Sequence, residues 1–238
     1  MTKTKYITSG GLAFTEQKDM EKLRRYSLKG WHVKKFKFMG YSLEKGESAD
    51  YIYSIDYRSL KKDEDDDYYD FFTSAGWTHV TSESDIHLFR AHPGTKPIYT
   101  DRDTTVSKYE NSSRSMNKLA IPLIIMAALM WLGTVLTSGI SHTVFLTIAL
   151  ILTVLAIPAT WTVIAVYNNK WKVEEKRGRV NFTRIVPYLL LLIAILTLVL
   201  GGDKSLIISV LSSSIIGAVT FPTAIWLIMS LYHKVRQN

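Results

Sequence analysis

The sequence LAIPLIIMAALMWLGTVLT (residues 119–137) decides the fold, because no ionisable side chain interrupts it. About 20 helical residues, at ~1.5 Å each, are needed to cross a hydrocarbon core of ~30 Å. Further apolar runs follow at residues 144–167, 183–200 and 206–232. We therefore predict an all-α bundle of four transmembrane helices over residues 119–238, preceded by a separate N-terminal domain.

The placement of Lys and Arg predicts which side of the membrane each segment faces. The connection between the second and third spans, residues 168–184, is basic, whereas the two connections on the other side hold only Lys204. Loops rich in Lys and Arg stay in the cytoplasm, so the N-terminal domain, this loop and the C-terminus are expected inside. We assign the net charge of +8 to topology and anionic lipids rather than to nucleic acid. The residues that we expect to set the topology are Lys170, Lys172, Lys176, Arg177 and Arg179.

Two sets of side chains in the spans have expected roles. Small residues recur every four positions at Ser209, Ser213 and Gly217, a spacing that lets helices approach closely, within the chain or between copies. A polar pathway through the bundle is the alternative. Aromatic side chains near the cytoplasmic ends of the second and fourth spans are expected at the membrane interface. They are Trp161, Tyr167, Trp226 and Tyr232.

The N-terminal half, residues 1–105, contains one order of segments twice. A short extended segment is followed by an amphipathic stretch, a Gly-Trp pair and two strand-like segments. The Gly of each pair ends the amphipathic stretch, where a left-handed C-cap is favoured. The first copy comprises residues 6–8, 15–29, 30–31, 32–38 and 41–45, and the second comprises residues 51–57, 63–74, 76–77, 78–82 and 86–90.

The repeated β-α-β-β order predicts an α+β domain in which an antiparallel sheet carries two helices on one face. Strand alternation places Asp56 and Arg58 on the face opposite Ile55, where they meet solvent or a partner. Residues 106–118 are expected to form a juxtamembrane linker to the spans. The expected domain core contains Trp31, Trp77, Tyr51, Tyr53, Phe71 and Phe72.

Five short motifs carry a resemblance to a known family. They are GWHV (residues 30–33), YSLEKGE (41–47), DYIYSIDYR (50–58), FFTSAGW (71–77) and IYTD (98–101). Over roughly residues 5 to 103 the chain resembles the bacterial DUF2812 family. Members typically join this domain to membrane spans and are often met in Gram-positive bacteria beside PadR-type regulators. The resemblance implies a regulated membrane role and brings no activity and no catalytic residues.

No catalytic, metal-binding or cofactor-binding pattern is expected. The chain has no Cys, its six His residues lack zinc-site spacing, and the acidic run at residues 63–67 lacks the spacing and turn Gly of a Ca²⁺ loop. The span interiors contain no charged residue and no His, which argues against ion-coupled transport.

We therefore expect a non-enzymatic, multi-pass protein of the bacterial cell membrane. Its cytoplasmic domain would bind a partner or ligand, as a sensor, regulatory or stress-response module. The expected partners are the lipid bilayer and another protein or a second copy of the chain, without nucleic acid, metal or cofactor. The alternative is a small transporter or pore-forming subunit that the N-terminal domain gates.

Because the chain contains no Cys, single cysteines test this topology directly. Cysteines replacing Ser48, Gly178 or Asn238 should resist a membrane-impermeant thiol reagent in intact cells, and one replacing Asp203 should react. The basic middle loop dictates this outcome, since Lys and Arg are retained in the cytoplasm. Reaction at position 178 together with protection at position 203 would mean the reverse orientation.

Overall fold

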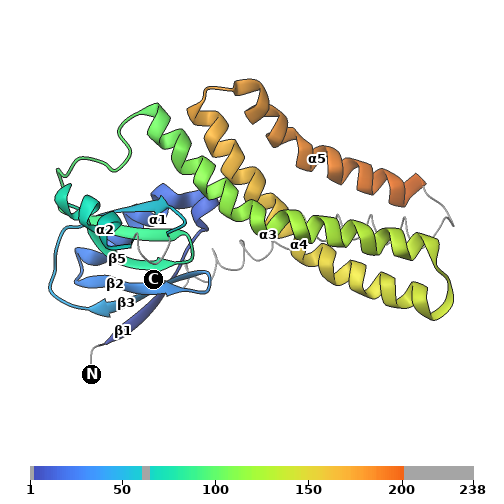
Figure 1. The fold of residues 1–238 in the computed structure, drawn as a ribbon, viewed down its shortest axis with the longest axis horizontal. Coiled ribbons are helices and arrows are strands. Elements are labelled where there is room, and N and C mark those ends of the chain that lie inside the picture. The colour runs from blue at the N-terminus through green and yellow to red at the C-terminus, as the bar shows by residue number, and fades with distance from the viewer. Residues whose placement is uncertain (1–2, 61–64, 201–238) are drawn as a thin grey trace. The chain divides into compact units, whose positions relative to one another are not determined.

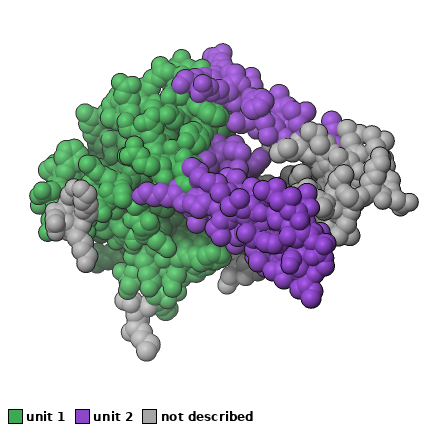
Figure 2. Space-filling view, turned by 45° about the vertical axis from the view of Figure 1, so that its right-hand side comes forward, with its two compact units in different colours: residues 1–117, 165–175 green, residues 118–164, 176–238 purple. Residues whose placement is uncertain are grey.

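The computed structural model describes residues 3–60 and 65–200, and the chain divides into two compact units (Figure 2). The first unit holds residues 1–117 and 165–175, and the second holds residues 118–164 and 176–238. The predicted fourth span, at residues 206–232, lies outside the described residues. So do the side chains expected on it, which are Ser209, Ser213, Gly217, Trp226 and Tyr232.

Two three-stranded antiparallel sheets form the N-terminal part of the first unit (Figure 1). The first sheet has the strand order β1-β3-β2 and the second the order β4-β6-β5. Helix α1 (Leu12–Ser27) follows β1, and helix α2 (Asp65–Ser74) follows β4. The strands are β1 (Thr4–Thr8), β2 (Trp31–Lys37), β3 (Gly40–Lys45), β4 (Ile52–Tyr57), β5 (Thr78–Glu83) and β6 (Ile86–Ala91).

The β-α-β-β order holds in both halves, but the prediction of one continuous sheet is wrong. Strand β2 ends the first sheet and β5 ends the second. Each carries a bulge, at Val33–Lys35 in β2 and at His79–Thr81 in β5. A bulge adds twist and interrupts the hydrogen-bond ladder, so neither edge continues into the other sheet.

Two glycines turn the chain from helix to strand. Gly30 after α1 has a φ angle of 72°, and Gly76 after α2 has one of 85°. Both angles lie in the left-handed region, which glycine adopts without the steric cost of a Cβ. The N–H of Trp77 then donates to the carbonyl of Phe72 at 2.9 Å, which closes α2 as a helix C-cap does.

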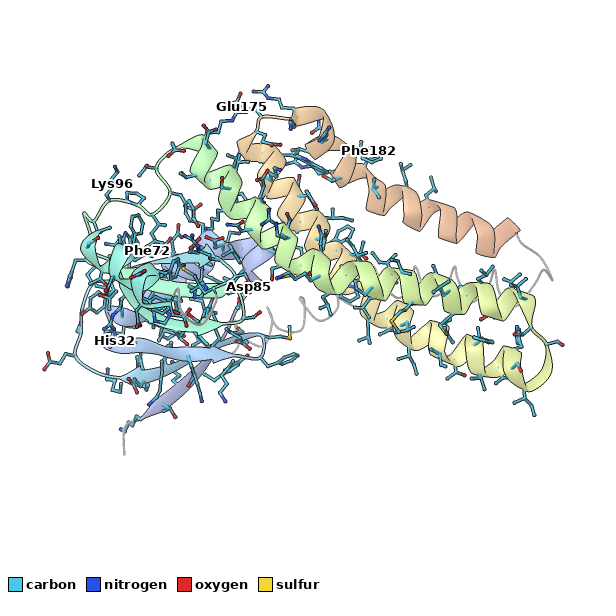
Figure 3. The ribbon with its side chains drawn as sticks, in the orientation of Figure 1. His32, Phe72, Asp85, Lys96, Glu175 and Phe182 are labelled. Carbon is cyan, nitrogen blue, oxygen red and sulfur yellow. The ribbon has the colours of Figure 1, made fainter. Side chains whose placement is uncertain are left out.

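The two helices cover opposite faces of the second sheet, which corrects the prediction that they share one face. Met20 and Leu23 of α1 pack in a buried cluster with Leu88 of β6. Phe72 of α2, labelled in Figure 3, packs in another cluster with Phe89 of β6. Leu88 and Phe89 are neighbours on one strand, so their side chains leave the sheet on opposite faces. Both faces of this sheet are apolar, and each therefore needs its own helix.

The predicted core residues divide into three groups. Tyr53, Phe72 and Trp77 are buried. Trp31 and Tyr51 are partly buried and pack against the cluster that contains Leu23. Phe71 is 69% exposed, so its assignment to the core is wrong. It is next to Phe72 on α2, and a step of one residue turns a helix by about 100°, which carries Phe71 out of the packed face.

Up to residue 200, where the described part of the chain ends, three long helices follow the N-terminal domain. They are α3 (Arg102–Leu136), α4 (Gly139–Val173) and α5 (Arg177–Leu200). Residues 106–118, the predicted linker, are helical and belong to α3. The basic loop predicted at residues 168–184 is much shorter, because α4 runs to Val173 and α5 begins at Arg177; Glu175, labelled in Figure 3, lies in this turn. By length and composition, α3 and α4 could each cross a membrane.

Close packing joins α3 and α4 within the second unit. The indole Nε1 of Trp131 donates to Oγ1 of Thr153 at 3.0 Å. At Gly133 a Cβ would lie 2.7 Å from the ring of Phe145, so the absence of a side chain admits that ring. Small residues at helix contacts have this effect in membrane bundles.

The different exposure of Phe71 and Phe72 predicts effects of very different size when each is replaced by Ala. Phe72→Ala should lower the free energy of unfolding by ~3–5 kcal/mol, because it leaves a cavity beside Phe89. Phe71→Ala should change it by less than about 0.5 kcal/mol, as for an exposed side chain. Hydrogen exchange of the β5 and β6 amides in the detergent-solubilised chain measures both. Equal losses would show that α2 packs through a different face.

Candidate functional site

A buried carboxylate lies beneath α2. Asp56 of β4 is only 7% exposed, and the Tyr68 hydroxyl donates to its Oδ2 at 2.5 Å. The Tyr99 hydroxyl and the backbone N–H of Tyr57 both donate to Oδ1, the latter at 2.8 Å. Asp56 lies on the predicted face of β4, opposite Ile55. The expectation that this face meets solvent is wrong for Asp56, because α2 covers it. We call Asp56, Tyr68 and Tyr99 the Asp56 network.

The tyrosines of this network are held in their donating form. Burial, with the Asp56 charge second, raises the pKa of Tyr68 well above its usual value of 10. The same two causes raise the pKa of Tyr99. Both hydroxyls therefore keep their protons at neutral pH, and each satisfies one oxygen of a carboxylate that burial would otherwise penalise.

An open cavity of about 260 Å³ lies against the outer side of this network. It is lined by Arg58, Leu60, Asp67, Tyr68 and Phe71, and we call it the Arg58 pocket. The Arg58 guanidinium lies 5.5 Å from the centroid of the Tyr68 ring. Phe71, misplaced in the predicted core, is instead the exposed aromatic wall of this pocket. A guanidinium beside an exposed aromatic ring can bind a ligand that has both an anionic group and a flat apolar group. The guanidinium contacts the anion, and the ring contacts the apolar group.

A chain of hydrogen bonds supports the backbone of Arg58. His87 is buried, and its Nε2 lies 2.8 Å from the Arg58 carbonyl, which can only accept. Nδ1 of His87 lies 2.7 Å from the Ser82 hydroxyl, which can donate or accept. His79 Nε2 lies 2.7 Å from the same hydroxyl, and burial followed by the neighbouring His87 lowers the pKa of His79. These hydrogen bonds hold the backbone of Arg58, and with it one wall of the pocket, in place.

A buried ion pair joins α3 to α1 within the first unit. The Lys108 ammonium of α3 donates to Oε1 of Glu16, and their side chains are 7% and 18% exposed. The same ammonium lies 5.0 Å from the centroid of the Tyr99 ring. Tyr99 therefore connects the two sites: its hydroxyl donates to Asp56, and its ring contacts Lys108 of the ion pair.

The end of α4 runs antiparallel to the start of α3 in the same unit. Arg102 donates to the Glu174 carbonyl at 2.6 Å, Glu110 pairs with Lys170 at 2.6 Å, and Asn117 donates to the Tyr167 hydroxyl at 3.1 Å. Asn169 of α4 also donates to the Ala13 carbonyl of α1 at 2.8 Å. The beginning of α3 and the end of α4 thus form one docked helix pair on α1.

The residues expected to set topology or meet the membrane interface have these places. Tyr167 and Lys170 belong to the docked pair, and Lys172 donates to Asn169 Oδ1 at 3.4 Å. Trp161 of α4 is 40% exposed. Lys176 precedes α5, and Arg177 and Arg179 lie in its first turn.

Sequence reasoning singled out Asp56 and Arg58 but missed the other residues of the site, Tyr68, Tyr99 and Lys108. Tyr68 comes from α2, Tyr99 from the loop after β6, and Lys108 from α3, so no local spacing connects them. One signal was available. The register pairs Ser82 with His87 across β5 and β6, and a hairpin prediction would have brought those side chains together.

Residues 15–121 match the model of a family described as "Protein of unknown function (DUF2812)". The match begins in α1 and ends in α3 next to Pro122, so it includes Glu16, the Asp56 network and Lys108. It starts later and extends further than the resemblance at residues 5 to 103. No curated protein and no solved structure shows a match to this chain.

The raised pKa values of Tyr68 and Tyr99 predict a loss of stability at high pH. Unfolded tyrosine titrates near pH 10, so this stability is complete below about pH 10 and is lost as pH rises, by up to ~1.4 kcal/mol per unit and tyrosine. Asp56→Asn keeps an acceptor but removes the charge, and should reduce the alkaline loss. Unfolding of the full chain between pH 8 and 11.5 measures it. Constant wild-type stability up to pH 11.5 would contradict the burial of these hydroxyls.

Proposed function

This chain is a DUF2812 domain-containing protein, and we propose that it is a non-enzymatic membrane regulator. Its cytoplasmic domain binds a partner or ligand and transmits that event to the helices that cross the bilayer. The observation that supports the proposal best is the buried Lys108–Glu16 ion pair, because it fixes the start of α3 to the domain. A movement of the domain when a partner or ligand binds would then also move α3.

The ion pair is a strict constraint on the position of α3. A buried charge is tolerated only beside a partner, and removal of one member leaves the other uncompensated. Within the described residues, Oε2 of Glu16 has no hydrogen-bond partner, so Lys108 provides the compensation for this carboxylate. Helix α3 is one helix from Arg102 to Leu136, so the segment that carries Lys108 continues into the apolar segment.

The Arg58 pocket is the binding site in this proposal. Arg58 attracts an anionic group, Asp67 restricts that group to the Arg58 side of the pocket, and exposed Phe71 offers it an apolar neighbour. A protein partner would present an acidic side chain beside an apolar one. Tyr68 lines the pocket and donates to Asp56, while Tyr99 contacts both Asp56 and Lys108. A ligand that moves Tyr68 withdraws a donor from Asp56, and the change reaches the ion pair through Tyr99.

The membrane location rests on two further arguments. Helices α3 and α4 could each cross a membrane by length and composition, and the apolar sequence continues in two later runs. Lys and Arg cluster on one side of these runs, which favours a cytoplasmic domain. Transport is the weaker proposal, since the interiors of the predicted spans contain no charged residue to couple to an ion, and Arg184 lies at the very start of the third span.

A double-mutant cycle on the ion pair tests the transmission. Lys108→Met and Glu16→Leu should each lower the stability of the α1–α3 contact by ~3–5 kcal/mol, because each leaves one buried charge unpaired. The double variant should regain most of the loss, since two apolar side chains replace both charges. Hydrogen exchange of α1 and of residues 102–117, in the full chain in nanodiscs, measures the contact.

The same variants test function when a photo-crosslinking amino acid replaces Phe71 in native membranes. The probe should capture a partner or ligand, Arg58→Glu should abolish capture, and a probe at Ser48 should not capture it. Lys108→Met should weaken capture although Lys108 does not line the pocket. Additive effects of Lys108→Met and Glu16→Leu, with capture unchanged by Arg58→Glu, would reject the proposal.

A further inference from the structure

Three large apolar side chains are exposed at one end of the N-terminal domain. Phe38 and Met39, in the turn between β2 and β3, are 89% and 52% exposed, and Phe14, in the first turn of α1, is 50% exposed. Exposed apolar side chains that gather in one patch often mark an interaction surface. We call these residues the apolar tip.

The two parts of the apolar tip belong to the same end of the domain. The N–H of Ser9 donates to the Met39 carbonyl at 2.9 Å, and Ser9 lies four residues before Ala13. Ala13 precedes Phe14 and accepts the hydrogen bond from Asn169 of α4. The turn and the start of α1 are thus joined through residues 9–13, beside the docked helix pair.

This contact also places the start of α1, which carries Phe14, along α4. Asn169 follows Tyr167, the expected interface anchor, by two residues, which is about 3 Å along a helix. Because Asn169 bonds to Ala13 directly, the start of α1 lies close to the level at which α4 would enter the headgroup layer.

Basic side chains accompany the apolar ones. Lys35 and Lys37 on β2 are exposed and precede the turn, and Lys18 is one helical turn after Phe14. An open hollow of about 300 Å³, lined by Lys5, Tyr6, Lys37, Phe38 and others, lies next to the turn. Two carboxylates at the start of α1 are paired, since Glu16 pairs with Lys108 and Asp19 accepts from Ser9 and Gly10. Exposed Lys18, Lys35 and Lys37 therefore accompany the apolar tip, with exposed Glu21 one turn after Lys18 on α1.

We propose that the apolar tip inserts into the headgroup layer of the cytoplasmic leaflet, with Lys35 and Lys37 contacting anionic lipid phosphates. This inference rests on the proposed membrane location. Aromatic and aliphatic side chains ringed by Lys match the mixed chemistry of that layer. The spans already hold the domain at the bilayer, so even a weak contact is populated at the high effective concentration of a tethered group. The contact would fix the domain against the membrane as a third support beside α3 and α4.

The absence of native Cys makes a single-site test possible. The full-length Phe38→Cys variant is labelled with an environment-sensitive fluorophore. It is then reconstituted in nanodiscs of phosphatidylcholine with or without phosphatidylglycerol. We expect a blue shift and an intensity rise of about twofold or more in anionic discs, as each Lys adds attraction to an anionic surface. A label at Ser48→Cys, at the opposite end of the first sheet, should not change.

A charge-matched pair of variants separates the patch from net charge. Lys35→Glu with Lys37→Glu should abolish the response of the label at position 38, whereas Lys29→Glu with Lys96→Glu should preserve it. Equal signals at position 38 in neutral and anionic discs would overturn the proposal. The proposal would also be overturned if the blue shift of the label at position 38 persisted in detergent without lipid and decreased on dilution of the protein. A second copy of the chain would then cover the apolar tip.

Failure of this inference is distinguishable from failure of the proposed function. Extraction of the chain from membranes by alkaline carbonate would contradict the membrane location and, with it, both proposals. A chain that resists carbonate but carries a solvent-exposed label at position 38 would overturn only the insertion of the apolar tip.

Discussion

The buried pairing of Glu16 with Lys108 is the constraint on which the arrangement of the first unit depends. Apolar contacts between two helices tolerate small rotations and shifts, whereas a shift that separates this largely buried carboxylate and ammonium leaves both charges uncompensated. Replacing such a pair by apolar side chains is often neutral for stability. Its effect here is therefore positional: it fixes one face and one turn of α3 against α1. The contacts of α4 with Ala13 and Glu110 follow from that placement.

The Asp56 network applies the same physics with neutral donors. A carboxylate under α2 receives three hydrogen bonds, two of them from tyrosines that burial keeps protonated. Leaving one buried acceptor unpaired costs about 1–3 kcal/mol, which is comparable with a typical coupling energy between sites. Because Tyr68 also lines the Arg58 pocket and Tyr99 also contacts Lys108, the network lies in contact with both the pocket and the ion pair.

The sequence predicts features that depend on local pattern and misses those that depend on distant contacts. The apolar run at residues 119–137, the β-α-β-β order and the glycine turns at Gly30 and Gly76 follow from composition, alternation and backbone sterics. The division into two sheets does not, because a bulge has no strong sequence signal. The burial of Asp56 depends on which face α2 covers, and β6 is apolar on both faces. Phe71 and Phe72 are equally apolar, so only the packing of α2 distinguishes them.

The family match clarifies which contacts belong to the domain itself. It ends at residue 121, after the docked part of α3 and before most of the apolar run, so Lys108 lies inside the matched unit and Asn169 and Lys170 lie outside it. The ion pair is therefore a contact within the domain, and the docking of α4 is an addition made by the rest of this chain. That addition positions the apolar tip, since Asn169 connects the start of α1 to α4. A domain attached through α3 alone would have one helix contact, and rotation about that helix would meet little resistance. The hydrogen bond from Asn169 to Ala13 adds a second attachment, so the helix pair is held to α1 from two helices instead of one.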